Sequence, residues 1–408
     1  MPPNKKNKIV RLPAMTTAPH RRDLIASAFQ SRFGTPPDLW CRAPGRVDLM
    51  GSHTDYNLGA VLTLPIGRDT WIAARANQTN RVNLHSLNLN ADASFALDST
   101  EKNADQPWID YVHGVAAALQ EEGLPLSGFD GVIHSTVPLR SGLSSSAALE
   151  CAAATVFETL GGWQLAPLQK ALLCQRAENR YVGVNCGILD QFTSCMGQQG
   201  CALLLDCRDL SSHPVTIAED IRIVICDTKS QRQLAGSEYG ERRAQCETGA
   251  RLLGATALRD VTPEHLHAHQ QDLPAIVAMR CRFIIEEHAR VYALAEALPN
   301  NDRTAIRHLA AASFAGACDL YEIAAPAMHS MMAAMLAAPG VIGARQAGAG
   351  FGGCMVAFVE DGQVEAFAAA VRAHYFATTT LKPDIYPVTA AAGAGLIQDF
   401  GKSLMGEV

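Results

Sequence analysis

Hydrophobic and polar positions follow two different periods along the first half of the chain. Short runs in which apolar residues alternate with polar ones, or stand together between turn residues, are typical of strands. Runs of this kind occur at 69–77, 81–90 and 129–138. Apolar or small residues at helical spacing occur at 22–33, 146–162 and 166–183. The pattern predicts mixed strands and helices, without the regular strand–helix alternation of a wound parallel sheet.

The second half is richer in long helices. Its predicted strands are 201–209 and 221–228, its predicted helices are 237–254, 282–298 and 363–376, and a glycine-rich, strand-like segment occupies 340–360. Near residues 200–215 the predicted elements change from mixed strands and helices to mostly long helices, although no linker marks a boundary there. The sequence therefore predicts an α+β protein with two intermixed halves.

The composition is that of an ordinary soluble protein. The chain has 408 residues, of which 48% are hydrophobic and 18% are charged, and its net charge is −6. A negative net charge argues against nucleic-acid binding by the molecule as a whole. The basic residues that precede Asp23 stand among prolines and polar residues, so we expect residues 1–21 to form a flexible basic tail.

The sequence indicates neither export nor membrane insertion. No apolar run approaches the roughly 20 residues that cross a bilayer, and the N-terminus lacks the apolar core of a secretory signal. The 12 cysteines are spread through apolar surroundings without a Cys-x-x-Cys pair, which is typical of buried, reduced thiols. We therefore expect a cytoplasmic protein with no nucleic-acid or membrane partner.

A serine-rich turn between a strand and a helix is the first candidate for chemistry. In "VPLRSGLSSSAALE" an apolar strand ends at Pro138, and Gly142 and three serines lead into a helix. A helix N-terminus presents unpaired N–H groups and a partial positive charge, both of which suit a phosphate. Serines are also common helix caps, so the motif alone leaves both interpretations open.

Two further segments combine turn residues with candidate functional groups. In "GARQAGAGFGGCMV" four glycines precede a buried strand, which suits either a backbone pressed against a ligand or a flexible turn. In "AENRYVGVNCGILDQFTS" Asp190 follows a glycine-containing turn, and Glu178 lies on the preceding helical stretch. An acid in such a turn suits a base or a charge positioner, and equally a helix cap.

Taken together, five segments in one order resemble the GHMP small-molecule kinases, and within them the galactokinases. The segments are "GRVDLMGSHTDYNLGAVL", "PLRSGLSSSAALE", "YVGVNCGILDQF", "AGSEYGERRAQCE" and "GARQAGAGFGGC", and the resemblance covers residues 22–400. It implies a two-lobed α+β fold with the active site in the cleft between the lobes. The N-terminal lobe would be ribosomal protein S5 domain 2-like, residues 22–208, and the C-terminal lobe ferredoxin-like, residues 209–408.

The resemblance implies an ATP-dependent kinase for the anomeric hydroxyl of a sugar, most simply D-galactose, with Mg²⁺ as cofactor. Asp190 matches the catalytic aspartate and Arg46 the transition-state arginine. The sugar-binding positions match Ser52, His53, Thr54, Asp55, Gly187 and Tyr239. The ATP-binding positions match Arg140, Ser141, Gly142, Leu143, Ser144, Ser145 and Ser146, and the metal ligands match Ser146 and Glu178. The expected partners are the sugar and ATP, and a monomer is favoured.

These residue types suit phosphoryl transfer, which needs positioning and charge neutralisation more than covalent chemistry. Asp190 would accept the proton of the C1 hydroxyl, or only orient that hydroxyl. Arg46 would stabilise the negative charge that spreads over the transferred group and would hold Asp190 ionised. The crowded corner "GSHTDYN" suits a polyol, because each sugar hydroxyl both donates and accepts hydrogen bonds.

The sequence departs from the galactokinase pattern at a few positions. Ser52 stands where the pattern has a glutamate directed toward the sugar C6 hydroxyl, and Asp48 and Gly240 each replace a common asparagine. Arg140 replaces a glycine of the phosphate loop. The loss of a carboxylate at Ser52 leaves galactose, galacturonate and L-arabinose as candidate sugars, and an inactive sugar- and ATP-binding sensor as a further alternative.

Overall fold

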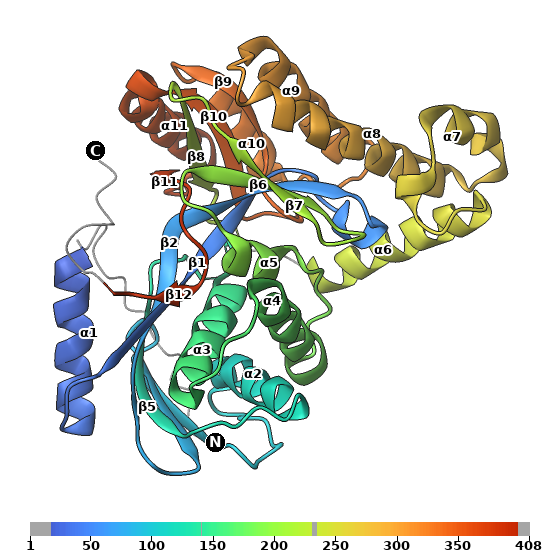
Figure 1. The fold of residues 1–408 in the computed structure, drawn as a ribbon. Coiled ribbons are helices and arrows are strands. Elements are labelled where there is room, and N and C mark those ends of the chain that lie inside the picture. Colours follow the sequence, from blue (N-terminus) through green and yellow to red (C-terminus); the bar gives the residue numbers. More distant parts are fainter. Residues whose placement is uncertain (1–17, 140, 231–234, 399–408) are drawn as a thin grey trace, which may run out of the picture.

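The computed structural model describes residues 18–139, 141–230 and 235–398, although of 235–237 only the helical backbone is described. Two β-sheets with helices on their outer faces form the molecule (Figure 1). Arg140, residues 1–17 and residues 399–408 lie outside the described part, so the predicted tail and the predicted role of Arg140 stay predictions.

The first sheet has eight strands in the order β12-β1-β2-β5-β3-β4, with β6 and β7 attached beside β2. Its strands are β1 (Leu39–Met50), β2 (Ala60–Ala76), β3 (Arg81–Ser86), β4 (Ala91–Ala96), β5 (Phe129–Ser135), β6 (Cys201–Asp206), β7 (Ser212–Thr216) and β12 (Gly395–Leu396). All pairs are antiparallel except β3 with β5. Because β7 and β12 pair within this sheet, the sheet also takes in segments beyond residue 208.

The second sheet is antiparallel, with four strands in the order β11-β8-β10-β9. Its strands are β8 (Ile221–Asp227), β9 (Val341–Gln346), β10 (Cys354–Glu360) and β11 (Asp384–Val388). The predicted strand-like segment 340–360 is thus two strands, β9 and β10, joined by the glycine-rich turn. The turn is sharp because Gly348, Gly350, Gly352 and Gly353 all adopt a positive φ, which glycine adopts without steric cost.

Helices cover the outer faces of both sheets (Figure 1). Those of the N-terminal half are α1 (Ala18–Phe33), α2 (Asp110–Glu121), α3 (Ser145–Gly161), α4 (Pro167–Arg176) and α5 (Leu189–Met196), with a π-helical turn at Ala177–Val182. Those of the C-terminal half are α6 (Ala235–Leu252), α7 (Pro263–His269), α8 (Ala275–Ala297), α9 (Arg303–Asp319), α10 (Pro326–Leu336) and α11 (Val364–Thr379). Within the described ranges, no helix is both long enough and apolar enough to cross a membrane.

Two apolar cores determine where the candidate site forms. Helices α2, α3, α4 and α5 pack on one face of the first sheet around Phe129, Phe157 and Phe192. A second core joins the two sheets, since Leu62 and Leu64 of β2 pack with Ile223 and other residues of β8, α8 and α9. The loops that follow β1, precede α3 and precede α5 therefore meet at a junction fixed by cores on both sides.

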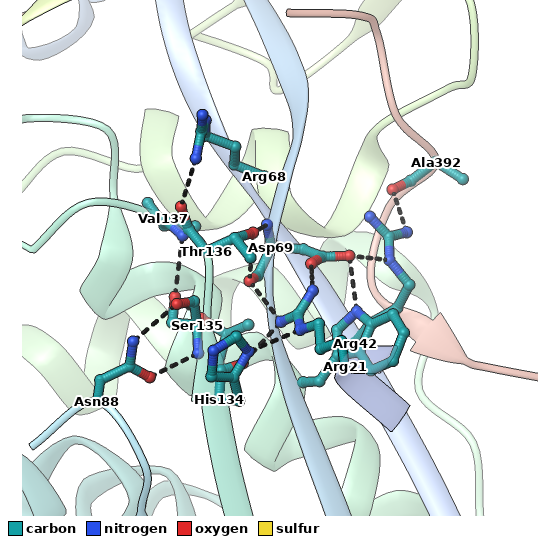
Figure 2. Close-up of polar contacts among 12 residues, drawn as sticks. Arg21, Arg42, Arg68, Asp69, Asn88, His134, Ser135, Thr136, Val137 and Ala392 are labelled. Atoms are coloured by element: carbon teal, nitrogen blue, oxygen red, sulfur yellow. Dashed lines mark hydrogen bonds and ion pairs between the residues drawn. The ribbon is translucent and has the colours of Figure 1, made fainter. Parts of the chain in front are cut away.

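Helix α1 covers the opposite face of the first sheet and begins earlier than the sequence predicts. Residues 18–21 belong to this helix rather than to a flexible tail, and Arg21 is only 4% exposed. The Arg21 guanidinium lies 2.5 Å from the Asp69 carboxylate and contacts His134 (Figure 2). It also stacks over the Trp71 ring. A charged residue that pairs with a buried carboxylate extends the helix beyond the predicted boundary, and a hydropathy pattern cannot detect such a pair.

The charges around Asp69 shift the pKa of this carboxyl and of its neighbour His134. Burial alone would raise the pKa of Asp69, but Arg21 and Arg42 outweigh it and lower the pKa to about 2. Burial and the nearby Arg21 lower the pKa of His134 to about 4. Asp69 is therefore ionised and His134 neutral at physiological pH, and the cluster fastens α1 to strands β1, β2 and β5.

Candidate functional site

Arg46 and Asp190 form the centre of the candidate site. Arg46 lies on β1, just after a register shift between Pro44 and Arg46, and Asp190 lies in the first turn of α5. Two guanidinium nitrogens, Nε and Nη2, donate to Asp190 Oδ1 over 2.8 and 2.5 Å. The Asp190 side chain is 25% exposed, whereas that of Arg46 is 9% exposed. The arginine thus holds a carboxylate that solvent and ligands can reach.

Arg46 also contacts the serine-rich loop before α3. Its Nη1 donates to the Gly142 carbonyl over 2.6 Å, and its backbone N–H donates to the Leu143 carbonyl over 3.2 Å. Gly45, beside it, has no room for a side chain, because a Cβ there would lie 2.6 Å from the Leu143 oxygen. One arginine therefore fixes the candidate catalytic carboxylate relative to the candidate phosphate loop.

Two residues of the candidate phosphate loop have left-handed backbone conformations. Gly142 and Ser144 adopt positive φ values of 83° and 61°, and α3 begins at Ser145. Among the described residues, the buried Ser144 hydroxyl has no hydrogen-bond partner, and its side chain makes no capping bond. Ser144 stands at the N-cap position, but its side chain does not cap the helix. Ser141 donates to the Pro138 carbonyl and stabilises the turn.

Glu178 lies in the first turn of the π-helical segment, where its carboxylate interacts with the Ser146 hydroxyl. Burial first, and then the negative charge of Asp190, raise the pKa of Glu178 to about 7. Carboxylates that repel one another in this way are stabilised by a cation, and hydroxyl and carboxylate oxygens are the ligands that Mg²⁺ prefers. No cluster of three or more His, Cys, Asp or Glu residues suited to a metal occurs in the described ranges. Two protein oxygens nevertheless fit Mg²⁺, which usually keeps several waters and substrate phosphates as ligands.

Asp55 and Gly187 are in direct contact beside Asp190. Asp55 opens a short 3₁₀ turn, Asp55–Asn57, between β1 and β2. A Cβ at Gly187 would lie 2.0 Å from Asp55 Oδ2, so only glycine leaves room for this carboxylate. Loss of surrounding water raises the pKa of Asp55 to about 6, and the charges of Asp190 and Asp48 add to this effect. Asp55 is a strong acceptor for a hydroxyl donor at neutral pH.

Tyr239 on α6 completes this side of the site. Its ring centroid lies 5.3 Å from that of His53 and 5.4 Å from that of Tyr56. Burial first, and then the charge of Asp55, raise the pKa of the Tyr239 hydroxyl well above its usual value. The neutral Tyr239 hydroxyl can donate and accept hydrogen bonds, as sugar recognition requires.

Three of the predicted sugar-binding side chains are hydrogen-bonded within the protein. Thr54 Oγ1 is 2.7 Å from the carbonyl oxygens of Gly51 and Ala60, so it stabilises the turn. His53 adopts a positive φ of 66° and places its ring nitrogens 2.9 Å from the Tyr56 hydroxyl and 3.0 Å from the Ala349 carbonyl.

Ser52 donates to Asp48 Oδ2 over 2.8 Å and accepts from Arg345 over 2.8 Å. The structure therefore brings Arg46, Asp55, Gly187, Asp190 and Tyr239 together, whereas the hydroxyl of Ser52 is already hydrogen-bonded to protein groups.

Several residues around the site escaped the sequence analysis. Gln191 Nε2 donates to Glu178 over 2.6 Å and to the buried Glu150 over 2.9 Å, so it orients the candidate metal ligand. In the sequence, only its position next to Asp190 could have indicated a role for Gln191. Tyr321 lies 2.8 Å from the Tyr56 hydroxyl and supports the His53 side of the loop. Tyr321 belongs to no motif and reaches the loop through tertiary packing alone.

Known protein families match three parts of this chain. Residues 27–76 match the galactokinase galactose-binding signature, residues 110–198 the GHMP kinases N terminal domain, and residues 294–377 the GHMP kinases C terminal family. The first two matches contain Arg46, Asp55, Glu178 and Asp190.

Curated relatives extend over almost the whole chain. The galactokinase of Chloroflexus aurantiacus is 41% identical over 377 residues, which are 91% of this chain and 96% of the relative. The galactokinase of a Roseiflexus species is 39% identical over 380 residues, 92% and 97% of the two chains.

Solved structures agree with these relatives. The galactokinase of Lactococcus lactis, complexed with galactose, superposes with a TM-score of 0.87 and 32% identity, covering 91% of this chain and 98% of its own. The mevalonate kinase of Methanococcus jannaschii, with a TM-score of 0.61 and 16% identity over 86% of this chain and 98% of its own, shares the fold. The predicted α+β fold is thereby confirmed.

Proposed function

Because this chain belongs to the galactokinase family of GHMP kinases, we propose that it transfers the γ-phosphoryl group of ATP to the C1 hydroxyl of D-galactose. The contact of Arg46 with both Asp190 and Gly142 carries the proposal. A group that spans the candidate carboxylate and the candidate phosphate loop lies where phosphoryl transfer needs a cation.

Asp190 would act on the nucleophile. Its carboxylate would accept a hydrogen bond from the C1 hydroxyl and take the proton as the bond to phosphorus forms. Arg46 pairs with the carboxylate and would stabilise the charge on the equatorial oxygens of the transferred group.

The phosphate loop and Glu178 would hold the nucleotide. The Gly142–Ser146 backbone at the start of α3 would bind the phosphates, with the Ser144 hydroxyl as an additional donor. Ser146 and Glu178 would bind Mg²⁺ through their oxygens. The metal, when bound, would neutralise phosphate charge.

Asp55 and Tyr239 would recognise the sugar hydroxyls. Asp55 offers two acceptor oxygens, and Gly187 leaves room for this carboxylate. A site that hydrogen-bonds a particular hydroxyl strongly rejects a sugar that lacks it. The preference for the galacto configuration would arise from this pair rather than from Ser52.

A coupled ADP-release assay tests the proposal. Purified protein with ATP and Mg²⁺ would be offered galactose, galacturonate, L-arabinose, N-acetylgalactosamine and glucose, with Asp190→Asn as the matched control. Turnover on galactose that disappears in the control supports the proposed function. A preference for galacturonate or L-arabinose would replace the substrate. Binding of sugar or ATP without turnover on any of the sugars would contradict the kinase assignment and indicate a sensor.

A further inference from the structure

A buried network of charged and hydroxyl groups joins the sugar-signature loop, residues 51–57, to the second sheet. Its centre is Arg345 on β9, which is fully buried. The guanidinium Nη2 donates to Ser52 Oγ over 2.8 Å and to Glu287 Oε1 over 2.9 Å, and Nε donates to Ser313 Oγ over 3.0 Å. Since Ser52 follows β1 and Arg345 lies on β9, the network connects the two sheets.

The Ser52 hydroxyl has no proton left for a ligand. A serine hydroxyl has one proton and two lone pairs. Ser52 directs its proton at Asp48 Oδ2 and uses one lone pair for Arg345, and the residue is 2% exposed. A sugar C6 hydroxyl could accept a hydrogen bond from Ser52 only if the bond to Asp48 were broken, which is unfavourable in a buried site. It could donate only to the second lone pair of this oxygen, in a residue that is almost fully buried.

Carboxylates and guanidinium groups alternate in the network. Asp48 and Glu287 face Arg345, and Arg290 pairs with Glu287 and with the partly exposed Glu286. Glu287 is bonded to both arginines, and its Oε1 also accepts the Gly51 N–H over 3.2 Å. Burial raises the pKa of Glu287, but the two arginines together lower it below its usual value. The loop is therefore attached to α8 at Gly51 as well as to β9 at Ser52.

Asp48 has fewer hydrogen bonds in the network than Glu287. It is 1% exposed, its Oδ1 has no hydrogen-bond partner among the described residues, and Arg345 Nη1 lies 3.7 Å from that oxygen. Its other oxygen depends on Ser52. Asp48 and Ser52 are also the two positions of this segment that depart from the galactokinase pattern, which has Asn and Glu there. This chain thus has a carboxylate at position 48, on β1, and the pattern has one at position 52. The total charge of the two positions is the same in both.

We propose that Ser52 and Asp48 are positioning residues that act through Arg345 to hold the sugar-signature loop, and that Ser52 is not a ligand of the sugar C6 hydroxyl. This inference rests on the proposed function, because its consequence is read in sugar kinetics. Relative to the galactokinase pattern, Asp48 replaces Asn and Ser52 replaces Glu. One carboxylate therefore still faces Arg345 from this segment, and the short Ser52 side chain is hydrogen-bonded within the network.

Two alanine variants test the role of Ser52. Ser313 provides a matched control, because its hydroxyl also accepts from Arg345 and donates to a carboxylate, Glu287, but lies on α9 outside the sugar signature. We expect Ser52→Ala and Ser313→Ala each to lower kcat/KM for galactose about ten-fold. Both variants should leave the ratio of kcat/KM values for galactose and 6-deoxygalactose within two-fold of wild type, with KM for ATP unchanged.

A selective change in that ratio would overturn the inference. If Ser52→Ala lowers the preference for galactose over 6-deoxygalactose ten-fold or more and Ser313→Ala does not, Ser52 contacts the C6 hydroxyl. The wild type is measured in the same series with galactose. Absence of wild-type turnover would overturn the proposed function and this inference with it, whereas a shifted ratio in an active enzyme overturns the inference alone.

A charge-exchange cycle separates positioning through Arg345 from simple packing. Asp48→Asn leaves Arg345 with less negative charge, and Ser52→Glu adds a third carboxylate to the network. We expect each single variant to lower kcat/KM for galactose and the double variant Asp48→Asn/Ser52→Glu to recover most of the loss. Losses that simply add in the double variant would overturn the inference. Thermal unfolding of all three variants, together with the milder alanine pair, identifies any loss due to misfolding.

Discussion

The carboxylate of Asp55 occupies the space that a side chain at position 187 would need. A Cβ at Gly187 would lie 2.0 Å from Asp55 Oδ2. Because Asp55 lies on the loop after β1 and Gly187 lies in the turn before α5, this contact fixes the candidate sugar side of the site relative to the candidate catalytic helix. The absence of a side chain at position 187 is therefore a requirement of the site geometry.

Gly187→Ala should damage sugar binding without unfolding the protein. The new methyl group would displace the Asp55 carboxylate, and a misplacement of about 1 Å at such a site costs about 10²-fold in rate. We expect a loss of this order in kcat/KM for galactose and a nearly unchanged KM for ATP. Steady-state kinetics with each substrate varied in turn provide the measurement.

Gly240→Ala is the control for this substitution. Gly240 lies on α6 next to Tyr239, and a Cβ there would meet no heavy atom within 4 Å. Its alanine variant should keep wild-type kinetics. Equal kinetic losses in both variants would mean that any added methyl group disturbs the site, and that the contact between Gly187 and Asp55 has no special role.

Asp190→Asn should abolish most turnover while the fold persists. The amide keeps the shape of the carboxylate but loses the charge that pairs with Arg46 and that, in the proposed function, would receive the C1 proton. Loss of one such group lowers kcat by about 10²–10³. ADP release measures kcat, and titration with galactose shows whether binding survives. A variant that retains wild-type kcat would exclude Asp190 from the reaction.

The raised pKa of Asp55 predicts a pH dependence of sugar use. Below its pKa of about 6 the carboxyl is protonated and loses an acceptor for sugar hydroxyls. We expect kcat/KM for galactose to fall with each further pH unit by about ten-fold. A profile of kcat/KM between pH 5 and 8 checks this, and Asp55→Asn should lose the part of the acidic limb that belongs to Asp55, leaving only that of Glu178, whose pKa is about 7. A wild-type profile without this acidic limb would contradict the prediction.

The same shift affects stability in a defined direction. The folded pKa of Asp55, about 6, exceeds the value of about 3.9 that an aspartate has in an unfolded chain. The folded state therefore binds more protons between these two pH values, and the contribution of Asp55 to stability falls as pH rises through that window. Chemical unfolding of the wild type and of Asp55→Asn at several pH values should show this difference in slope.

Local patterns predicted much of the fold. The strand β5 and the helices α3 and α11 appear close to their predicted ranges, since each has a clear period in a continuous segment. The strand β1 was not among the predicted strands, because it contains Pro44 and Gly45. Both residues are tolerated at the register shift, where the backbone of Leu143 approaches Gly45. A tertiary contact of this kind leaves no periodic signal in the sequence.

The candidate site likewise contains some residues that motifs predicted and others that only the structure reveals. Arg46, Asp190 and the serine loop could be selected from motifs, because glycines and small residues mark their turns. The bonding of Ser52 could not be predicted, since its partner Arg345 lies 293 residues away in the sequence. Glu287 and Tyr321 lie on elements without any motif and meet the loop only after both sheets have packed. Long-range polar contacts of this kind require the three-dimensional structure.

The ion pair of Arg21 with Asp69 should contribute strongly to the stability of the N-terminal half. Both side chains are almost fully buried, at 5% and 3% exposure. Removal of one partner of a buried pair leaves an uncompensated charge and costs about 3–5 kcal/mol. We expect Arg21→Ala to lower the free energy of unfolding by this order, as measured by urea denaturation at pH 7.

A surface pair on the same helix provides the control. Arg32 lies 3.0 Å from Asp92, with side chains that are 38% and 58% exposed, and such pairs contribute about 0–1 kcal/mol. Arg32→Ala should therefore change stability little. Because the folded pKa of Asp69 is about 2, below its unfolded value, its contribution is present above about pH 4 and is lost as pH falls toward 2. Equal effects of the two alanine substitutions at pH 7 would show that burial gives Arg21 no special role, and that α1 is held by its apolar face alone.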